Sequence, residues 1–165
     1  MADITLKGNA ISTIGDLPKI GSKAPSFTLT TVDLSHKSLS DFEGKNIIMN
    51  IFPSVDTGIC AMSVREFNEK ASGLENSVVL CISKDLPFAQ ARFCAAEGLD
   101  NVVMLSDFAK GDFGKDYKLN IANGPMADLH SRAIVIVNPK GIVTYTQQVP
   151  EIAEEPNYEA ALKAI

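Results

Sequence analysis

The 165-residue sequence predicts an α/β fold with a central mixed β-sheet flanked by helices. Two near-continuous apolar runs, NIIMNIF at 46–52 and NSVVLCIS at 76–83, have the length and composition of strands covered on both faces. The segment between them repeats its apolar residues at helical spacing, so the three together predict a parallel strand–helix–strand unit. RAIVIVN and IVTYTQQ flank Pro139-Lys140-Gly141 and predict an antiparallel hairpin, which makes the sheet mixed.

The remaining segments supply the flanking elements. Near the start, ITLKGNAISTI predicts a β-hairpin with its turn at Gly8-Asn9. Residues 85–101 predict a second helix, with Pro87 in its first turn and Gly98 at its end.

Three further elements complete the chain. Ser40 is predicted to cap a short turn of helix, a third strand follows at 102–107, and the polar connection over 107–131 contains a short helix. A closing helix ends the sequence. This order is typical of a thioredoxin-like α/β sandwich with an N-terminal hairpin extension. We expect residues 1–165 to form a single domain of this kind.

The charge balance argues against two classes of partner. The chain has 15 Lys and Arg residues against 20 Asp and Glu, a net charge of −5, and no block rich in Lys or Arg. Nucleic acid and anionic membrane surfaces are therefore poor partners. No apolar run approaches the roughly 20 residues of a membrane-spanning helix, and the first residues lack the basic and apolar regions of a signal peptide. We expect a soluble, cytoplasmic protein.

The cysteines and histidines give no sign of a metal site. Three cysteines without a C-x-x-C spacing indicate neither a secreted disulfide framework nor a zinc finger. His36 and His130 lie in polar surroundings, so we expect two surface imidazoles rather than metal ligands. On the first helix, Arg65 and Glu69 are predicted to form an outward-facing pair four residues apart.

The most informative local pattern is Pro53-x-x-x-Thr57-x-x-Cys60, where a buried strand leads into a helix. The first amide groups of a helix have no partners within it and the helix dipole is positive there, so a cysteine in the first turn is stabilised as thiolate. The thiolate is the form that attacks a peroxide. The Thr57 hydroxyl could bind the sulfur or a peroxide, and Pro53 could shield the sulfur from water. The residue types alone leave open that Cys60 is simply a small core residue.

Cys94 lies on the second predicted helix, between Gln90 and Glu97 on a helical wheel. This polar stripe predicts an accessible thiol, as a cysteine that resolves a sulfenic acid requires. Because a disulfide needs Cα atoms within about 7 Å, joining Cys60 to Cys94 implies local unfolding of one or both helices. Cys81 lies within an apolar strand and is expected to be buried and inert.

FPSVDTGICAMSVREF at 52–67 resembles the active-site signature of the peroxiredoxins, and the whole chain resembles their thiol peroxidase subfamily, an atypical two-cysteine type. The resemblance implies that Cys60 is the peroxidatic cysteine, that Pro53 and Thr57 belong to its site, and that Arg132 completes it. The residue pattern alone would favour a solvent-facing Arg132 at the start of a strand. The resemblance also implies that Cys94 is the resolving cysteine.

The implied reaction reduces hydrogen peroxide and alkyl hydroperoxides through a sulfenic acid on Cys60 and a Cys60–Cys94 disulfide, which thioredoxin reopens. It requires no metal, flavin or haem. Members of the subfamily usually form homodimers and serve in antioxidant defence. Two alternatives remain: a thioredoxin-fold binding module whose thiols are incidental, and a one-cysteine peroxidase in which Cys94 is a bystander.

Overall fold

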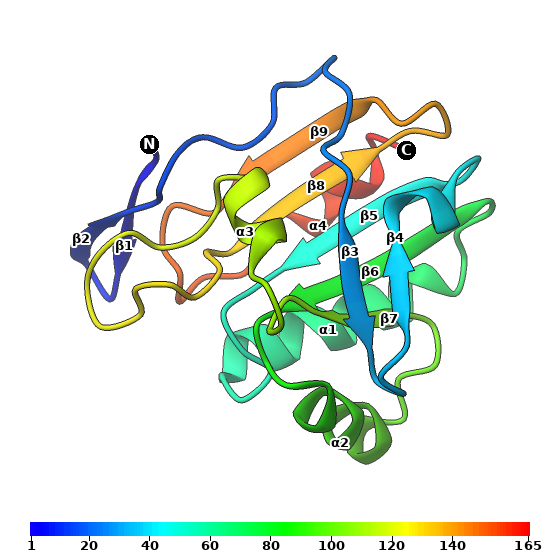
Figure 1. Cartoon of the computed structure of the whole chain (residues 1–165), viewed down its shortest axis with the longest axis horizontal. Coiled ribbons are helices and arrows are strands. Elements are labelled where there is room, and N and C mark those ends of the chain that lie inside the picture. Colours follow the sequence, from blue (N-terminus) through cyan, green and yellow to red (C-terminus); the bar gives the residue numbers. More distant parts are fainter.

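The computed structural model describes residues 1–165 and contains a mixed seven-stranded sheet, as predicted. Its strands lie in the spatial order β4-β3-β7-β6-β5-β8-β9 (Figure 1). The neighbouring pairs β5–β6 and β6–β7 are parallel, and the other four pairs in the sheet are antiparallel. The strands are β3 (Thr28–Thr31), β4 (His36–Ser38), β5 (Asn46–Ile51), β6 (Ser77–Ser83), β7 (Val103–Ser106), β8 (Ala133–Val137) and β9 (Val143–Gln148).

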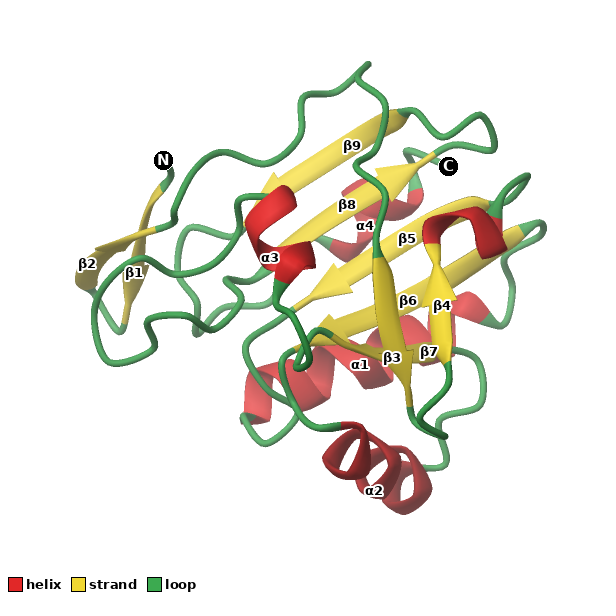
Figure 2. Cartoon of the chain, viewed as in Figure 1, coloured by secondary structure: helices red, strands yellow, loops and turns green.

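Helices cover both faces of this sheet. One face carries three α-helices, and the other carries a short α-helix and a 3-10 helix (Figure 2). The first group comprises α1 (Gly58–Ala71), α2 (Pro87–Glu97) and α4 (Tyr158–Leu162), and the second comprises α3 (Asp112–Asp116) and η1 (Leu39–Phe42). None of these helices combines the length and the apolar character needed to cross a membrane.

Strand β5 shows why the two faces form separate cores. Its alternate residues Ile47, Met49 and Ile51 belong to a cluster of 17 buried residues beneath α3 and η1. Ile48 points the other way, into a cluster of 13 buried residues beneath α1, α2 and α4. Strand β5 lies inside the sheet between β6 and β8, and the helices on either side cover both of its faces, which accounts for its continuous apolar sequence.

The predicted N-terminal hairpin is present as a separate two-stranded sheet of β1 (Asp3–Leu6) and β2 (Asn9–Ser12). Its turn lies one residue earlier than predicted, at Lys7 and Gly8, whose φ angles are 51° and 80°. Two central residues with positive φ match the twist of the flanking strands. Figure 1 shows the hairpin beside the sheet, against the loops that precede β8 and follow β9.

The predicted ends of α2 are confirmed, because Pro87 lies in its first turn and Gly98 ends it at a φ of 64°. The prediction that Ser40 caps η1 is wrong. The helix begins earlier, and the amide of Ser38 donates to the Asp41 carboxylate at 2.7 Å.

The prediction of two surface histidines is half wrong. His36 is exposed, but His130 is fully buried. Its Nε2 lies 2.9 Å from a carboxylate oxygen of Asp107, which also accepts the backbone amides of Phe113 and Gly114 in α3. Burial lowers the pKa of His130, and this effect is larger than the opposing effect of the Asp107 carboxylate, which raises the pKa. The polar residues around His130 suggested an exposed position, but a carboxylate distant in the sequence is its hydrogen-bond partner in the interior.

Candidate active site

Cys60 is the third residue of α1 and is fully buried. Strand β5 ends at Ile51, and the loop that follows is held by Asp85, whose carboxylate accepts the Ser54 hydroxyl at 2.7 Å and the Val55 amide at 2.9 Å. Pro53 lies buried at the start of this loop. The loop thus sets the position at which α1 begins, and with it the position of the sulfur.

Thr57 is the N-cap residue of α1. Its hydroxyl accepts the amide of Cys60 at 3.4 Å and donates to the carbonyl of Ser54 at 3.2 Å. The hydroxyl is therefore engaged with the backbone rather than with the sulfur. This arrangement satisfies one of the amides that the start of a helix leaves without a partner.

Arg132 lies directly before β8 and is only 1% exposed, so the solvent-facing position favoured by the residue pattern alone is wrong. Its Nη2 donates to the Cys60 sulfur at 3.2 Å, and its Nε donates to the carbonyl of Ile152 at 2.9 Å. Nη1 is buried and has no partner. The guanidinium thus lies directly against the sulfur, and the free Nη1 can donate to a further acceptor.

Cys94 lies on α2, as predicted, but its surroundings differ from the predicted polar stripe. Gln90, one turn earlier, is fully buried and donates to the carbonyl of Leu105 at 2.9 Å and to the Ser83 hydroxyl at 3.2 Å. Cys94 is half-buried and packs against the cluster that contains Cys60. This burial raises the pKa of Cys94, and the nearby charge of Asp100 adds to the effect. Gln90 therefore faces inward, where its amide finds partners, while Glu97 at the other end of the stripe is exposed.

Cys81 is fully buried, as predicted. Burial raises its pKa to about 12, so it is a thiol at neutral pH. The Asn50 side-chain amide lies 3.8 Å from its sulfur and 3.2 Å from the Ser63 hydroxyl of α1. All three cysteines are free in the structure.

Two ion pairs that the sequence did not predict join α2 to the Cys60 segment. Arg65 binds Glu97 through two bonds of 2.8 Å, and Arg92 binds Asp56 at 3.0 Å. The predicted pairing of Arg65 with Glu69 is wrong, because α2 offers a carboxylate in a geometry that engages both arms of the guanidinium. No local pattern could reveal a partner 32 residues away.

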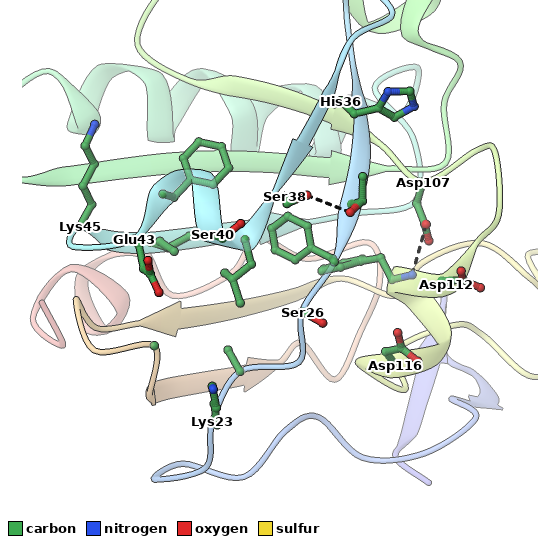
Figure 3. Close-up of a pocket in the computed structure, with 18 of the residues that line it drawn as sticks. Lys23, Ser26, His36, Ser38, Ser40, Glu43, Lys45, Asp107, Asp112 and Asp116 are labelled. Carbon is green, nitrogen blue, oxygen red and sulfur yellow. Dashed lines mark hydrogen bonds between the residues drawn. The ribbon is translucent and has the colours of Figure 1, made fainter.

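A cavity of about 820 Å³ lies on the opposite face of the sheet from Cys60 (Figure 3). None of the three cysteines lines it. Its lining mixes basic and acidic side chains, among them Lys23, Lys45, His36, Glu43, Asp112 and Asp116. No group of three or more His, Cys, Asp or Glu side chains is arranged to hold a metal ion. The cysteine that the sequence predicts to react therefore lies outside this groove.

Known proteins share both the sequence and the fold. Residues 19–162 match the Redoxin family. A thiol peroxidase from Mycobacterium tuberculosis is 59% identical over 165 residues, which cover 100% of this chain and 99% of the relative. A thiol peroxidase from Corynebacterium glutamicum is 48% identical over the same shares of the two chains. The chain belongs to the thiol peroxidase subfamily of the peroxiredoxins.

A solved structure supports this membership. The crystal structure of a peroxiredoxin-like protein from Aquifex aeolicus has a TM-score of 0.92 at 37% identity, covering 98% of this chain and 95% of that chain. The predicted family and the predicted thioredoxin-like fold are both confirmed. As a member of this family, the chain is a peroxidase that reduces peroxides with a cysteine thiol.

Proposed function

We propose that Cys60 is the peroxidatic cysteine of this enzyme. Its thiolate attacks the distal oxygen of a hydroperoxide, so that an S–O bond forms as the O–O bond breaks. The leaving oxygen takes up a proton and departs as water or an alcohol, and Cys60 is left as a sulfenic acid. The observation that carries this proposal is the bond of 3.2 Å from the Arg132 guanidinium to the Cys60 sulfur in a buried site.

Three residues support the attack in this proposal. Nη2 of Arg132 stabilises the thiolate, and the unpartnered Nη1 donates to the peroxide as negative charge develops on the leaving oxygen. The Thr57 hydroxyl caps α1 and exchanges its bond to Ser54 for one to the peroxide. Pro53, buried and without an amide hydrogen, keeps water away from the sulfur.

In the second step, the Cys94 thiol attacks the Cys60 sulfenic acid and expels water, which leaves a Cys60–Cys94 disulfide. Both residues lie on helices and Cys60 is fully buried, so at least one helix must unwind locally before the sulfurs meet. Reduced thioredoxin, a dithiol, then restores the two thiols by exchange and is itself oxidised.

The setting completes the proposal. The substrates are hydrogen peroxide and alkyl hydroperoxides, and the role is antioxidant defence. Residues 1–165 act as one unit that pairs into a homodimer. We place the reaction in the cytoplasm, because a chain with three cysteines and no C-x-x-C motif fits a reducing compartment.

Titration of the reduced protein with one equivalent of hydrogen peroxide tests the two-cysteine reaction. Intact mass and peptide mapping are expected to show the loss of two hydrogens and a Cys60–Cys94 crosslink. Addition of one oxygen retained on Cys60 would indicate a one-cysteine peroxidase instead. Recycling is tested separately, by NADPH consumption with thioredoxin and thioredoxin reductase; failure to recycle the crosslinked enzyme would contradict the assigned reductant.

A further inference from the structure

Arg132 is held in place by the segment that follows β9. Its Nε donates to the carbonyl of Ile152, and its own carbonyl accepts the amide of Val149 and the side-chain amide of Gln148, both at 3.0 Å. The Ile152 carbonyl is the only protein oxygen that binds the guanidinium. The place of this carbonyl therefore decides where Nη1 and Nη2 lie relative to the Cys60 sulfur.

The segment at 150–152 belongs to no regular element and connects β9 to α4. The N-terminal hairpin holds it from outside, as Figure 1 shows for the orange connection beside β1. The amide of Thr5 donates to the carbonyl of Pro150 at 2.7 Å, and the amide of Ile152 donates to the carbonyl of Thr5 at 2.9 Å. These two bonds attach the segment to β1 as an isolated parallel bridge between Thr5 and Glu151.

Glu151 strengthens this attachment with its side chain. One carboxylate oxygen accepts the Thr5 hydroxyl at 2.7 Å and the Gly8 amide at 3.0 Å. The other accepts the Lys7 amide at 2.9 Å and the Ala153 amide at 3.0 Å. Lys7 and Gly8 form the hairpin turn, and their positive φ angles direct both amides at the carboxylate.

The same four groups lower the pKa of Glu151 to about 2, the backbone amides of Ala153 and Gly8 having the largest effects. The carboxylate consequently keeps its charge over the pH range in which a cysteine titrates. A small apolar cluster also packs the hairpin against the loop before β8 and the segment after β9. It consists of Ile4, Ile11, Ile121 and Ile152.

We propose that Glu151 is a positioning residue for the peroxidase reaction, clamping the N-terminal hairpin onto the Ile152 segment so that the Ile152 carbonyl holds Arg132 against Cys60. This inference rests on the roles proposed above for Cys60 and Arg132. It gives the hairpin extension a function in the chemistry, although no hairpin residue contacts the sulfur through a hydrogen bond.

Glu151→Gln is the sharpest test, because the substitution is nearly isosteric but replaces one acceptor oxygen with an amide that faces two donors. Glu154→Gln removes the same charge three residues away, from an exposed side chain that makes no hydrogen bond, and is the matched control. Thr5→Val removes only one of the four bonds and serves if Glu151→Gln fails to fold. Arg132→Met is the reference for complete loss of the guanidinium.

The measurement is the second-order rate constant of Cys60 with hydrogen peroxide between pH 4 and 9, obtained by competition with catalase. Glu151→Gln is expected to lower the rate about tenfold, as a misplaced catalytic group does. It is also expected to move the pH midpoint of the rate upward, because a displaced guanidinium stabilises the thiolate less. Arg132→Met is expected to lower the rate about a hundredfold. Thr5→Val is expected to lie between Glu151→Gln and the wild type, and Glu154→Gln to stay within about twofold of the wild type.

Hydrogen exchange at the Lys7 and Gly8 amides reports whether the clamp has opened. A purely structural role would change this exchange or the melting temperature without moving the rate or its pH midpoint. The inference would be overturned if Glu151→Gln, or Thr5→Val in its place, had the same rate and pH midpoint as Glu154→Gln. A large loss of rate in Arg132→Met would then leave the proposed function standing. Unchanged rates in both Glu151→Gln and Arg132→Met would overturn both this inference and the proposed role of Arg132 at Cys60.

Discussion

The surroundings of Cys60 and Cys94 differ in how firmly they are held. Cys60 is fully buried, its sulfur accepts a hydrogen bond from Arg132, and the helix that carries it has five buried side chains. Cys94 is half-buried, and its helix α2 has only two buried side chains, Pro87 and Gln90. Much of what joins α2 to the Cys60 segment is polar, including two ion pairs at the surface.

This difference matches the two steps of the proposed reaction. Attack on a peroxide benefits from groups fixed before the substrate arrives, which buried contacts provide. Disulfide formation requires a segment that opens, and segments with few buried apolar contacts open at the lowest cost. Exposed ion pairs contribute only about 0.2–1 kcal/mol each, so they slow the opening of α2 without preventing it.

The largest expected effect separates the roles of the two cysteines. Cys60→Ser is expected to lower the rate of peroxide reduction by a factor of at least about 10³, because a hydroxyl is a far weaker nucleophile than a thiolate. Cys94→Ser is expected to undergo one oxidation and then to stop in a thioredoxin-coupled assay. Robust thioredoxin-dependent turnover by Cys94→Ser would remove the distinction between a fixed and a mobile cysteine.

A second prediction concerns the fixed side of the comparison. Thr57→Val is expected to lower the rate of Cys60 oxidation by about tenfold to a hundredfold through loss of the hydroxyl, and to cost about 1 kcal/mol of stability through loss of the N-cap. Thr57→Ser, which keeps the hydroxyl, should remain close to the wild type. The two variants are compared by the rate of oxidation with hydrogen peroxide and by urea denaturation. Equal oxidation rates for both variants would limit Thr57 to a structural role.

The third prediction is a loss of stability in acid that is caused by the buried His130. Because the pKa of His130 is lowered in the fold, the unfolded chain gains a proton below its ordinary value of about 6.5 while the folded chain does not. The free energy of unfolding should thus fall as the pH decreases through 6.5, by at most about 1.4 kcal/mol per pH unit for this one group. Urea denaturation at pH 7.5 and 5.5 measures the difference.

Two variants test whether His130 causes this pH dependence of the free energy of unfolding. His130→Gln is expected to reduce it, whereas His36→Asn, at an exposed position, should leave it unchanged. An equal slope in wild type and His130→Gln would show that other groups control the acid response.

The smallest effect concerns the mobile side. Glu97→Gln is expected to speed formation of the Cys60–Cys94 disulfide, by up to about fivefold, because the surface pair with Arg65 no longer holds α2 closed. Combining Arg65→Glu with Glu97→Arg should restore the slower rate. Glu159→Gln, which removes an exposed pair between α4 and its C-cap residue Lys163, is the control. Acid quenching and thiol alkylation after a pulse of peroxide measure the rate, and no acceleration in Glu97→Gln would mean that opening of α2 does not limit this step.

The features predicted correctly from the sequence were those that short stretches of chain specify. The continuous apolar run of β5 and the Pro87 and Gly98 signals of α2 correspond to elements of the structure. Failures came where a polar residue met a partner far away in the chain. His130 and Gln90 looked solvent-facing but are buried, because Asp107 and the carbonyl of Leu105 satisfy them.

Residues close together in the chain were enough to predict the fold class, the family and the Pro53-to-Cys60 motif, because the eight residues of that motif are consecutive at one strand–helix junction. The residues that surround this motif could be found only from the folded chain. Arg132 reaches Cys60 across 72 positions, and Glu151 joins the hairpin across more than 140. Contacts of this kind arise from chain topology, since hydrogen-bond partners far apart in sequence leave no local periodicity. The sequence thus predicts which sulfur reacts, while the packing of distant segments determines how firmly each cysteine is held.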